Sequence, residues 1–125
     1  MSTTVWPTHF PSHCPPSDAA DLSHTVLYLV TSDPPTADDF VSALERNWFV
    51  GKPDCERASL SCGITLEYIQ QLRESVPRLR QMLIVESQLD ASHGKIKPTG
   101  KPGHHSMWLL AVALQRAPTL FRVKQ

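Results

Sequence analysis

A short apolar run at residues 25–31, Thr-Val-Leu-Tyr-Leu-Val-Thr, is the feature that most constrains the fold of this chain. β-Branched and aromatic residues dominate the run, which is typical of a β-strand, and Asp33-Pro34-Pro35 ends it. Polar residues do not alternate with apolar ones along it. We therefore expect a strand that is covered on both faces.

Two segments have the periodicity of amphipathic helices that pack on the sheet. The first begins at Thr36, whose hydroxyl can accept first-turn amides, and its apolar stripe contains Phe40, Leu44 and Trp48. The second begins at Thr65 and ends before Pro77, because proline disfavours helix at the preceding residue. Its apolar face contains Leu66, Ile69, Leu72 and Val76.

The remaining apolar segments predict further strands. Residues 58–62 are a candidate short strand, 81–86 a strand, 106–114 a strand or buried segment, and 119–123 a terminal strand. This order of elements predicts an α+β fold with a small mixed or antiparallel sheet and two amphipathic helices. We expect one such domain over residues 24–125.

Residues 1–23 are rich in proline and predict an extended N-terminal arm. Proline lacks an amide donor and fixes φ, so a helix or sheet ladder is disfavoured there. Trp6 and Phe10 give the arm apolar surface to bury. We expect the arm to lie packed across the domain.

Three cysteines and the hydropathy profile bear on the compartment. No apolar run approaches the roughly 20 residues that a bilayer requires, and the N-terminus lacks the basic and apolar regions of a signal peptide. Cys14, Cys55 and Cys62 are odd in number at unremarkable spacing, which favours buried or idle reduced thiols. We therefore expect a cytoplasmic protein that is not bound to a membrane.

The formal charge is zero, but its distribution along the chain is uneven. Every charged residue from Met1 to Glu45 is acidic, and every one after Asp90 is basic. Either the two ends of the chain neutralise each other, or the C-terminal third presents a cationic face to an anion.

The segment from His93 to Trp108 is the candidate site. Its glycines and prolines indicate a folded-over loop rather than a helix or strand. It gathers histidines and lysines and precedes an apolar run. We expect it to form a shallow pocket walled by Trp108 and by the strand that contains Tyr28. The predicted ligand-binding residues are Tyr28, Lys95, Lys97, Thr99, Lys101, His104, His105 and Trp108.

Other site classes have weaker support. The order of glycines and lysines is not that of a P-loop. The pairs His13-Cys14 and His104-His105 are adjacent, and six residues separate Cys55 from Cys62, so no metal site is predicted. A Cys62 nucleophile would require the fold to bring His104 or His105 close. Nucleic acid is disfavoured because the pI is about 7.0 and only Trp108 supplies a nearby stacking ring.

Three groups of residues resemble a small, largely uncharacterised bacterial protein family. The first group is Asp33-Pro34-Pro35-Thr36-x-x-Asp39-Phe40-x-Ser42. The second is Gly63-Ile64-Thr65 before an amphipathic helix ending Pro77-x-Leu79. The third is His93-Gly94-x-Ile96-x-x-Thr99 with Gly103-His104-His105-x-x-Trp108. The opening strand and proline turn are also similar to ADP-ribosyltransferase and RES-type toxin domains. That similarity implies NAD contact from the strand and a toxin–antitoxin or defence context; members of the small family often have arginine where this chain has Tyr28.

The sequence thus predicts a small bacterial binding or interaction protein without a cofactor or an assigned catalytic residue. Its partner would be a protein or a phosphate-bearing small ligand. The alternative is an enzyme that uses NAD or a nucleotide, with Tyr28 and His104 or His105 lining the pocket, or a degenerate copy of one.

Overall fold

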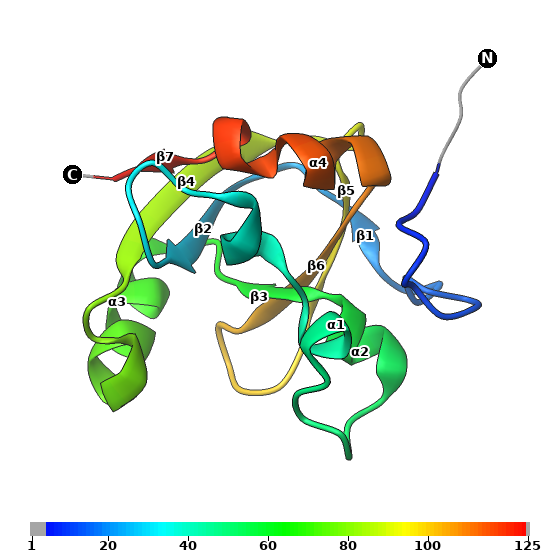
Figure 1. Cartoon of the computed structure of the whole chain (residues 1–125), viewed down its shortest axis with the longest axis horizontal. Coiled ribbons are helices and arrows are strands. Elements are labelled where there is room, and N and C mark those ends of the chain that lie inside the picture. Colours follow the sequence, from blue (N-terminus) through cyan, green and yellow to red (C-terminus); the bar gives the residue numbers. More distant parts are fainter. Residues whose placement is uncertain (1–4, 125) are drawn as a thin grey trace.

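The structure is a computed structural model in which residues 5–124 are described. It combines helices with antiparallel sheets, so the predicted α+β class is confirmed. Figure 1 shows α4 across the top of the sheets and α1, α2 and α3 below them. In chain order the elements are β1 (Ala20–Asp21), β2 (His24–Val30), the 3₁₀ turn η1 (Ala37–Phe40), α1 (Ala43–Arg46), α2 (Asp54–Ala58), β3 (Leu60–Cys62), α3 (Leu66–Ser75), the 3₁₀ turn η2 (Pro77–Leu79), β4 (Leu83–Leu89), β5 (Gly94–Pro98), β6 (His105–Leu109), α4 (Ala111–Leu120) and β7 (Arg122–Val123).

Within residues 5–124 the strands form two antiparallel sheets, ordered β1-β5-β6-β3 and β2-β4-β7. A bridge between Leu27 and Gly63 joins the sheets through backbone hydrogen bonds of 2.8 and 3.0 Å. Strand β2 pairs with β4 from His24 opposite Leu89 to Val30 opposite Leu83. The strands predicted near 25–31, 58–62 and 81–86 are therefore confirmed, with shifted ends.

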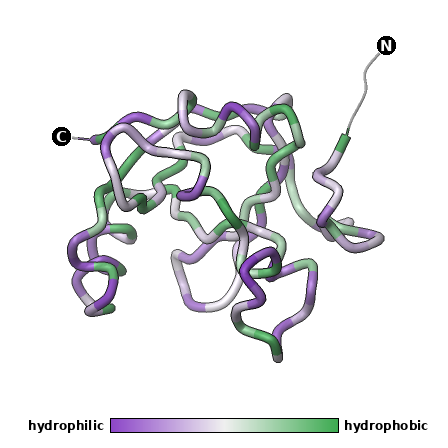
Figure 2. Tube along the Cα trace, in the orientation of Figure 1, coloured by the Kyte–Doolittle hydropathy of each residue, from purple (hydrophilic) through white to green (hydrophobic). Residues whose placement is uncertain are grey.

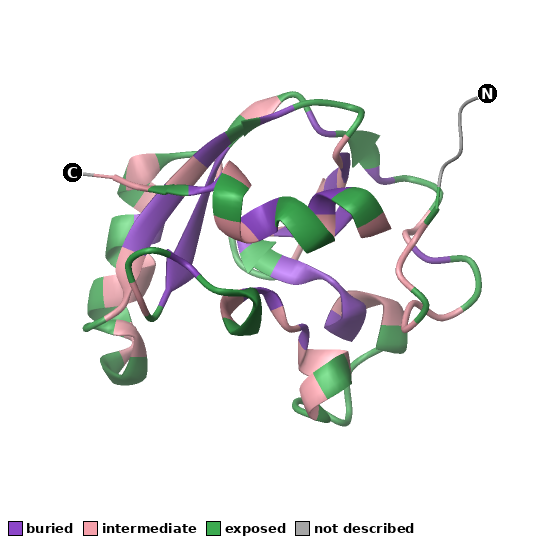
Figure 3. Ribbon diagram, turned by 45° about the horizontal axis from the view of Figure 1, so that its top comes forward, coloured by how far each residue is buried: buried purple, intermediate pink, exposed green. Residues whose placement is uncertain are grey.

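Strand β2 is apolar on both sides because each side meets a different layer. Val26 and Tyr28 belong to the main core, together with residues of α4 and of the four-stranded sheet. Leu27 and Leu29 point the other way and pack against Ile69 of α3. The prediction of a strand covered on both faces is confirmed, and Figure 3 draws β2 as mostly buried.

The N-terminal segment 5–19 contains no helix or strand and packs on the domain through its aromatic residues. The rings of Trp6 and Phe10 are stacked, with centroids 5.9 Å apart, and pack against a cluster that includes Trp108. The last part of the predicted arm pairs with β5 as strand β1. Residues 1–4 lie outside the described residues.

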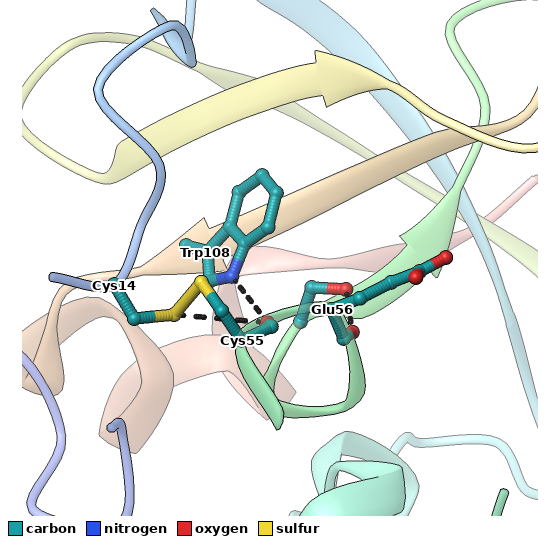
Figure 4. The surroundings of a disulfide bond; sticks show 5 residues. Cys14, Cys55, Glu56 and Trp108 are labelled. Atoms are coloured by element: carbon teal, nitrogen blue, oxygen red, sulfur yellow. Dashed lines mark hydrogen bonds between the residues drawn. A yellow bond between two sulfur atoms is a disulfide. The ribbon is translucent and has the colours of Figure 1, made fainter. Parts of the chain in front are cut away.

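A disulfide joins Cys14 of the arm to Cys55 of α2, and the two Cα atoms are 5.5 Å apart (Figure 4). The expectation of three reduced thiols is therefore wrong for this pair, while Cys62 is free and buried. Sequence spacing gave no sign of it because tertiary folding brings two distant segments together. The Trp108 indole N–H donates a 2.9 Å hydrogen bond to the carbonyl oxygen of Cys55. With Cys14 and Cys55 cross-linked, the cysteines no longer favour a cytoplasmic location.

The first predicted helix is two short pieces, not one continuous helix. Phe40 ends η1, and Ser42 begins α1 as its N-cap. The Ser42 hydroxyl accepts a 3.2 Å hydrogen bond from the Glu45 amide, and the Glu45 carboxylate accepts a 3.0 Å bond from the Ser42 amide. Asn47, with a left-handed backbone, ends α1. Trp48 consequently leaves the predicted helix stripe and is exposed.

The segment expected to be a folded-over loop is a β-hairpin instead. Strands β5 and β6 pair along their lengths, from Gly94 opposite Leu109 to Pro98 opposite His105. Only residues 99–104 form the tip of this hairpin, which lies between α3 and α1 in the view of Figure 1. Gly100 and Gly103, both with positive φ, lie in the tip and allow its turn.

The C-terminal region contains a helix that the sequence analysis missed. Strand β6 ends at Leu109, α4 follows, and β7 is shorter than the predicted terminal strand. Alanine has the highest helix propensity, and Ala113 and Ala117 bury their small side chains in the main core. Across residues 5–124 no helix has both the length and the apolar character needed to cross a bilayer.

Candidate binding site

The connection between α1 and α2 exposes consecutive large apolar side chains. Trp48, Phe49 and Val50 have exposed fractions of 54%, 56% and 65%. Figure 2 shows this connection as the hydrophobic tip at the bottom of the view. We call residues 47–52 the aromatic loop. Contiguous exposed apolar side chains are characteristic of binding surfaces, whereas scattered single ones are not.

The aromatic loop holds Phe49 in an unfavourable backbone conformation. Its φ angle is 57°, and that of Asn47 is 61°. Asparagine tolerates this region, whereas for phenylalanine the cost is on the order of 1 kcal/mol. Lys52 Nζ lies 5.9 Å from the centre of the Phe49 ring. Strained residues are concentrated at functional sites, so the loop is a candidate for one.

An apolar groove with a volume of about 340 Å³ extends from the aromatic loop to α3 and η2. Small-molecule sites typically enclose about 300–1,000 Å³ and are lined mainly by apolar side chains. Among the described residues that line the groove there is no Asp or Glu, whereas Arg78 and His104 are present. The apolar walls come from Val41, Trp48, Phe49, Leu72, Val76, Leu79 and Met82.

A smaller polar recess with a volume of about 160 Å³ adjoins the groove. Phe49, Ser59, Ser61 and His104 line both hollows, so the two adjoin and share part of their walls. The recess has in addition the polar side chains of Lys52, Glu56, Arg57 and Ser106. The site therefore combines an apolar body with a polar end.

Tyr68 of α3 positions the hairpin tip and, with it, His104. A Cβ atom at Gly63 would lie 2.7 Å from the Tyr68 ring, and one at Gly103 would lie 2.6 Å from it. Gly103 also has a φ of 90°. The two glycines thus let the Tyr68 ring pack between the end of β3 and the hairpin tip. There the ring faces His104 edge-on, with ring centroids 6.4 Å apart.

Hydrogen bonds to Thr99 hold the His104 ring at the boundary of the two hollows. His104 Nδ1 lies 3.0 Å from the Thr99 carbonyl oxygen and 3.0 Å from its hydroxyl. Because a carbonyl only accepts, Nδ1 is the donor, and Nε2 of the neutral ring carries the lone pair. The Thr99 hydroxyl is in turn 2.7 Å from that of Ser106.

Arg57 places a buried guanidinium in the wall of the recess, with only 7% of the residue exposed. Its Nε donates a 3.0 Å bond to the Trp48 carbonyl oxygen, and its Nη1 a 3.2 Å bond to Asp54 Oδ1. Within residues 5–124 Nη2 has no protein partner, yet no fully buried side-chain nitrogen or oxygen there lacks one. Nη2 therefore keeps contact with solvent.

The predicted lysines are largely engaged in ion pairs. Lys95 Nζ lies 2.9 Å from Asp21 Oδ1, and Lys97 Nζ lies 2.9 Å from Asp18 Oδ2. The hydrogen bond from Lys97 lowers the pKa of Asp18. In these pairs the early acids neutralise the late bases. Lys101 is exposed at the hairpin tip and forms no ion pair with the described residues.

The structure does not bring Tyr28 and Trp108 together. Tyr28 lines the groove, but its hydroxyl donates to the Asp39 carbonyl oxygen and its ring stacks on Phe40 at 5.0 Å. Burial raises the pKa of Tyr28, so the phenol stays neutral. Trp108 is 2% exposed and lines a separate hollow of about 440 Å³, with Lys97 and Thr99.

The two adjacent histidines have different environments. His104 lines the groove and the recess, whereas His105 pairs with Cys62 in the sheet and lines neither of these hollows. His105 Nδ1 donates to the Gly103 carbonyl oxygen at 3.1 Å. Successive side chains on an extended segment point to opposite faces, which explains the separation.

Asp39 gives the proline-turn motif a structural role. Its carboxylate accepts backbone hydrogen bonds of 2.8 Å from Thr31 and 2.9 Å from Thr36. Burial raises the pKa of Asp39, but these hydrogen bonds outweigh it, so the pKa is lowered overall. The carboxylate closes the turn between β2 and η1.

Sequence reasoning missed the aromatic loop, Lys52, Arg57 and Ser61 as site residues. The loop had one visible signal, because Trp48-Phe49-Val50-Gly51 places three large apolar residues directly before a glycine. Trp48 also follows Leu44 and Phe40 at intervals of four residues, as on a helix face, and this periodicity conceals the signal.

Across the described residues, no group of three or more His, Cys, Asp or Glu side chains could hold a metal ion. Comparisons with protein-family models, curated proteins and solved structures found no match. Function is therefore argued from the geometry of the groove and recess.

Proposed function

We propose that this chain is a noncatalytic binding protein whose groove takes a small apolar ligand. The observation that carries the proposal is the groove of about 340 Å³ beside two exposed rings of the aromatic loop. Covering apolar surface of this kind is favourable by about 25 cal/mol per Å². A ligand in the groove would cover Trp48 and Phe49, which the protein alone leaves in water.

A small ligand suits this site better than a flat protein surface does. The groove is concave and lies between separate elements, α3 on one side and the aromatic loop on the other. Its lining is mainly apolar with some polar groups, among them His104, Ser61 and Arg78, which is the usual composition of small-molecule sites.

Binding without turnover is favoured over NAD chemistry because the Tyr28 hydroxyl is engaged and the Cys62 thiol is buried. The Tyr28 hydroxyl donates to Asp39, and the Nδ1 atoms of His104 and His105 donate to backbone carbonyls. Cys62 is 1% exposed, and burial raises the pKa of its thiol, which disfavours the nucleophilic thiolate.

Isothermal titration calorimetry with 1-decanol, a neutral apolar probe, tests the proposal. We expect saturable binding by the wild type and binding weaker by at least about tenfold in Phe49→Gly, since losing a buried aromatic contact costs about 1.5–3 kcal/mol. Glycine also accepts the positive φ at this position, so the variant keeps its fold. The matched control is Val112→Ala, which truncates an exposed apolar side chain on α4, outside the groove.

Absence of saturable binding by the wild type would contradict the proposal. Equal weakening of 1-decanol binding by Phe49→Gly and Val112→Ala would also contradict it, because the probe would then not bind in the groove. Release of nicotinamide from NAD by the wild type would overturn the noncatalytic assignment.

A further inference from the structure

We infer that the polar recess holds a carboxylate, so that the ligand of this protein is an amphipathic carboxylate with its apolar body in the groove. The inference rests on the proposed function, because it assigns the other end of the same ligand. It follows from the charges and donors of the recess and from the residues that the two hollows share.

The charges that line the recess favour an anion. Lys52 and Arg57 contribute two cations, and Glu56 contributes one carboxylate. Arg57 is paired with Asp54, whose side chain is 67% exposed and therefore well solvated. The adjoining groove adds Arg78 and no acid among the described residues.

The donors in the recess suit a carboxylate. Arg57 lines the recess with a largely buried side chain, and its Nη2 has no protein partner in the described part of the chain. A guanidinium N–H is a charged donor and forms a strong hydrogen bond with a carboxylate oxygen. Lys52 supplies a second cation, and the exposed Ser61 hydroxyl a neutral donor. Charge–charge attraction is stronger beside a buried group than on an open surface.

The shared lining residues define how one molecule would occupy both hollows. Phe49 and His104 stand at the boundary, where the apolar wall gives way to polar side chains. A chain lying along Leu72, Val76 and Met82 would reach the recess at this boundary. The recess, with about 160 Å³, provides room for a small head group rather than for a nucleotide.

Calorimetric titrations with sodium decanoate, 1-decanol and decylamine test the inference, since the three probes share one apolar chain. We expect decanoate to bind at least about tenfold more tightly than 1-decanol, and decylamine no more tightly than 1-decanol. Lys52→Ala should remove most of the difference in affinity between decanoate and 1-decanol, with both probes titrated into the same variant. Lys101→Ala is the matched control, because it removes a lysine at the hairpin tip outside the recess.

The outcomes separate this inference from the proposed function. If 1-decanol binds and decanoate binds no more tightly, the carboxylate assignment is overturned, but the groove remains supported as an apolar binding site. If none of the three probes binds, both the proposed function and the carboxylate assignment are overturned. If Lys101→Ala weakens decanoate as much as Lys52→Ala, the overall surface charge is responsible and the recess assignment is overturned.

Discussion

Arg57 Nε donates a 3.0 Å hydrogen bond to the carbonyl oxygen of Trp48, which attaches the aromatic loop to α2. Helix α2 also carries Cys55, whose disulfide reaches the N-terminal arm. The exposed rings at the groove are therefore supported by a buried guanidinium and, one step further, by a covalent cross-link. Such a frame can hold a strained loop in place before any ligand arrives.

Replacing Arg57 with methionine should destabilise the protein while keeping much of the side-chain volume. A hydrogen bond to a charged group contributes about 1.5–3 kcal/mol, so we expect the free energy of unfolding to fall by about 2 kcal/mol. Urea denaturation followed by circular dichroism measures it. Arg116→Met on the exposed face of α4 serves as the control. An equal decrease in the free energy of unfolding for this control would show that the hydrogen bond to Trp48 does not account for the effect at Arg57.

Loss of the Cys14–Cys55 disulfide should destabilise the fold substantially. The two cysteines are 41 residues apart, and closing a loop of that length corresponds to about 4 kcal/mol in the chain-entropy account. We expect dithiothreitol to lower the urea midpoint of the wild type. The double variant Cys14→Ser/Cys55→Ser should show the lower midpoint with or without reductant.

Thiol counting gives an independent check of the disulfide. Protein purified without reductant and then denatured should react with iodoacetamide at Cys62 alone, since only that cysteine is free in the described structure. Three reactive thiols, together with a midpoint unaffected by dithiothreitol, would contradict the cross-link. A persistent disulfide favours an oxidising compartment over the cytoplasm that the sequence suggested.

Asp39→Ala should destabilise the turn after β2 by about 1 kcal/mol, the usual effect of removing a capping side chain. The folded-state pKa of Asp39 lies below its ordinary value of 3.8, so the contribution is complete above that pH. It is lost as the pH falls through the folded pKa. The wild type should therefore lose more stability than the variant below about pH 4 in acid titrations followed by circular dichroism.

Asp38→Ala is the matched control for that experiment. Asp38 pairs with Arg46 at 3.4 Å, but its side chain is 79% exposed. Exposed ion pairs contribute about 0–1 kcal/mol, so little change is expected. Equal effects at the two positions would count against the role assigned to the Asp39 carboxylate.

At alkaline pH the buried Cys62 thiol and Tyr28 phenol should make stability fall. Burial raises the pKa of both groups above their ordinary values of 9.0 and 10.0. Below about pH 9 they are neutral in both states; above it the unfolded chain loses protons first, and unfolding becomes easier. Urea midpoints at rising pH measure this, and Cys62→Ala should flatten the first part of the decline. An unchanged decline in that variant would contradict the assignment to Cys62.

The local sequence pattern was sufficient to predict the elements in which each face has one kind of surroundings. The apolar run that forms β2 and the amphipathic stripe of α3 both predict their burial, because each face meets one kind of surroundings. The α4 helix was missed because its apolar residues follow directly on those of β6, and periodicity cannot separate two adjoining apolar elements.

The candidate site depended on tertiary contacts that the sequence does not display. Lys95 and Lys97 looked available for an anion, but Asp21 and Asp18, more than 70 positions earlier, neutralise them. Conversely, Arg57 lies in a polar connection, and nothing in the sequence marks it as a site residue. Only the folded structure brings it within hydrogen-bonding distance of the Trp48 carbonyl oxygen. Of the predicted residues, His104 is the one that lines the groove and the recess together.

The most direct test of the account is a ¹H–¹⁵N correlation spectrum of the uniformly labelled protein during titration with sodium decanoate. We expect the shifted signals to cluster at the aromatic loop, Lys52, Arg57, Ser61 and His104, including the indole N–H of Trp48. The signals of Lys95, Lys101 and Trp108 should stay in place. Shifts concentrated at the latter three residues, or no shifts at all, would contradict it.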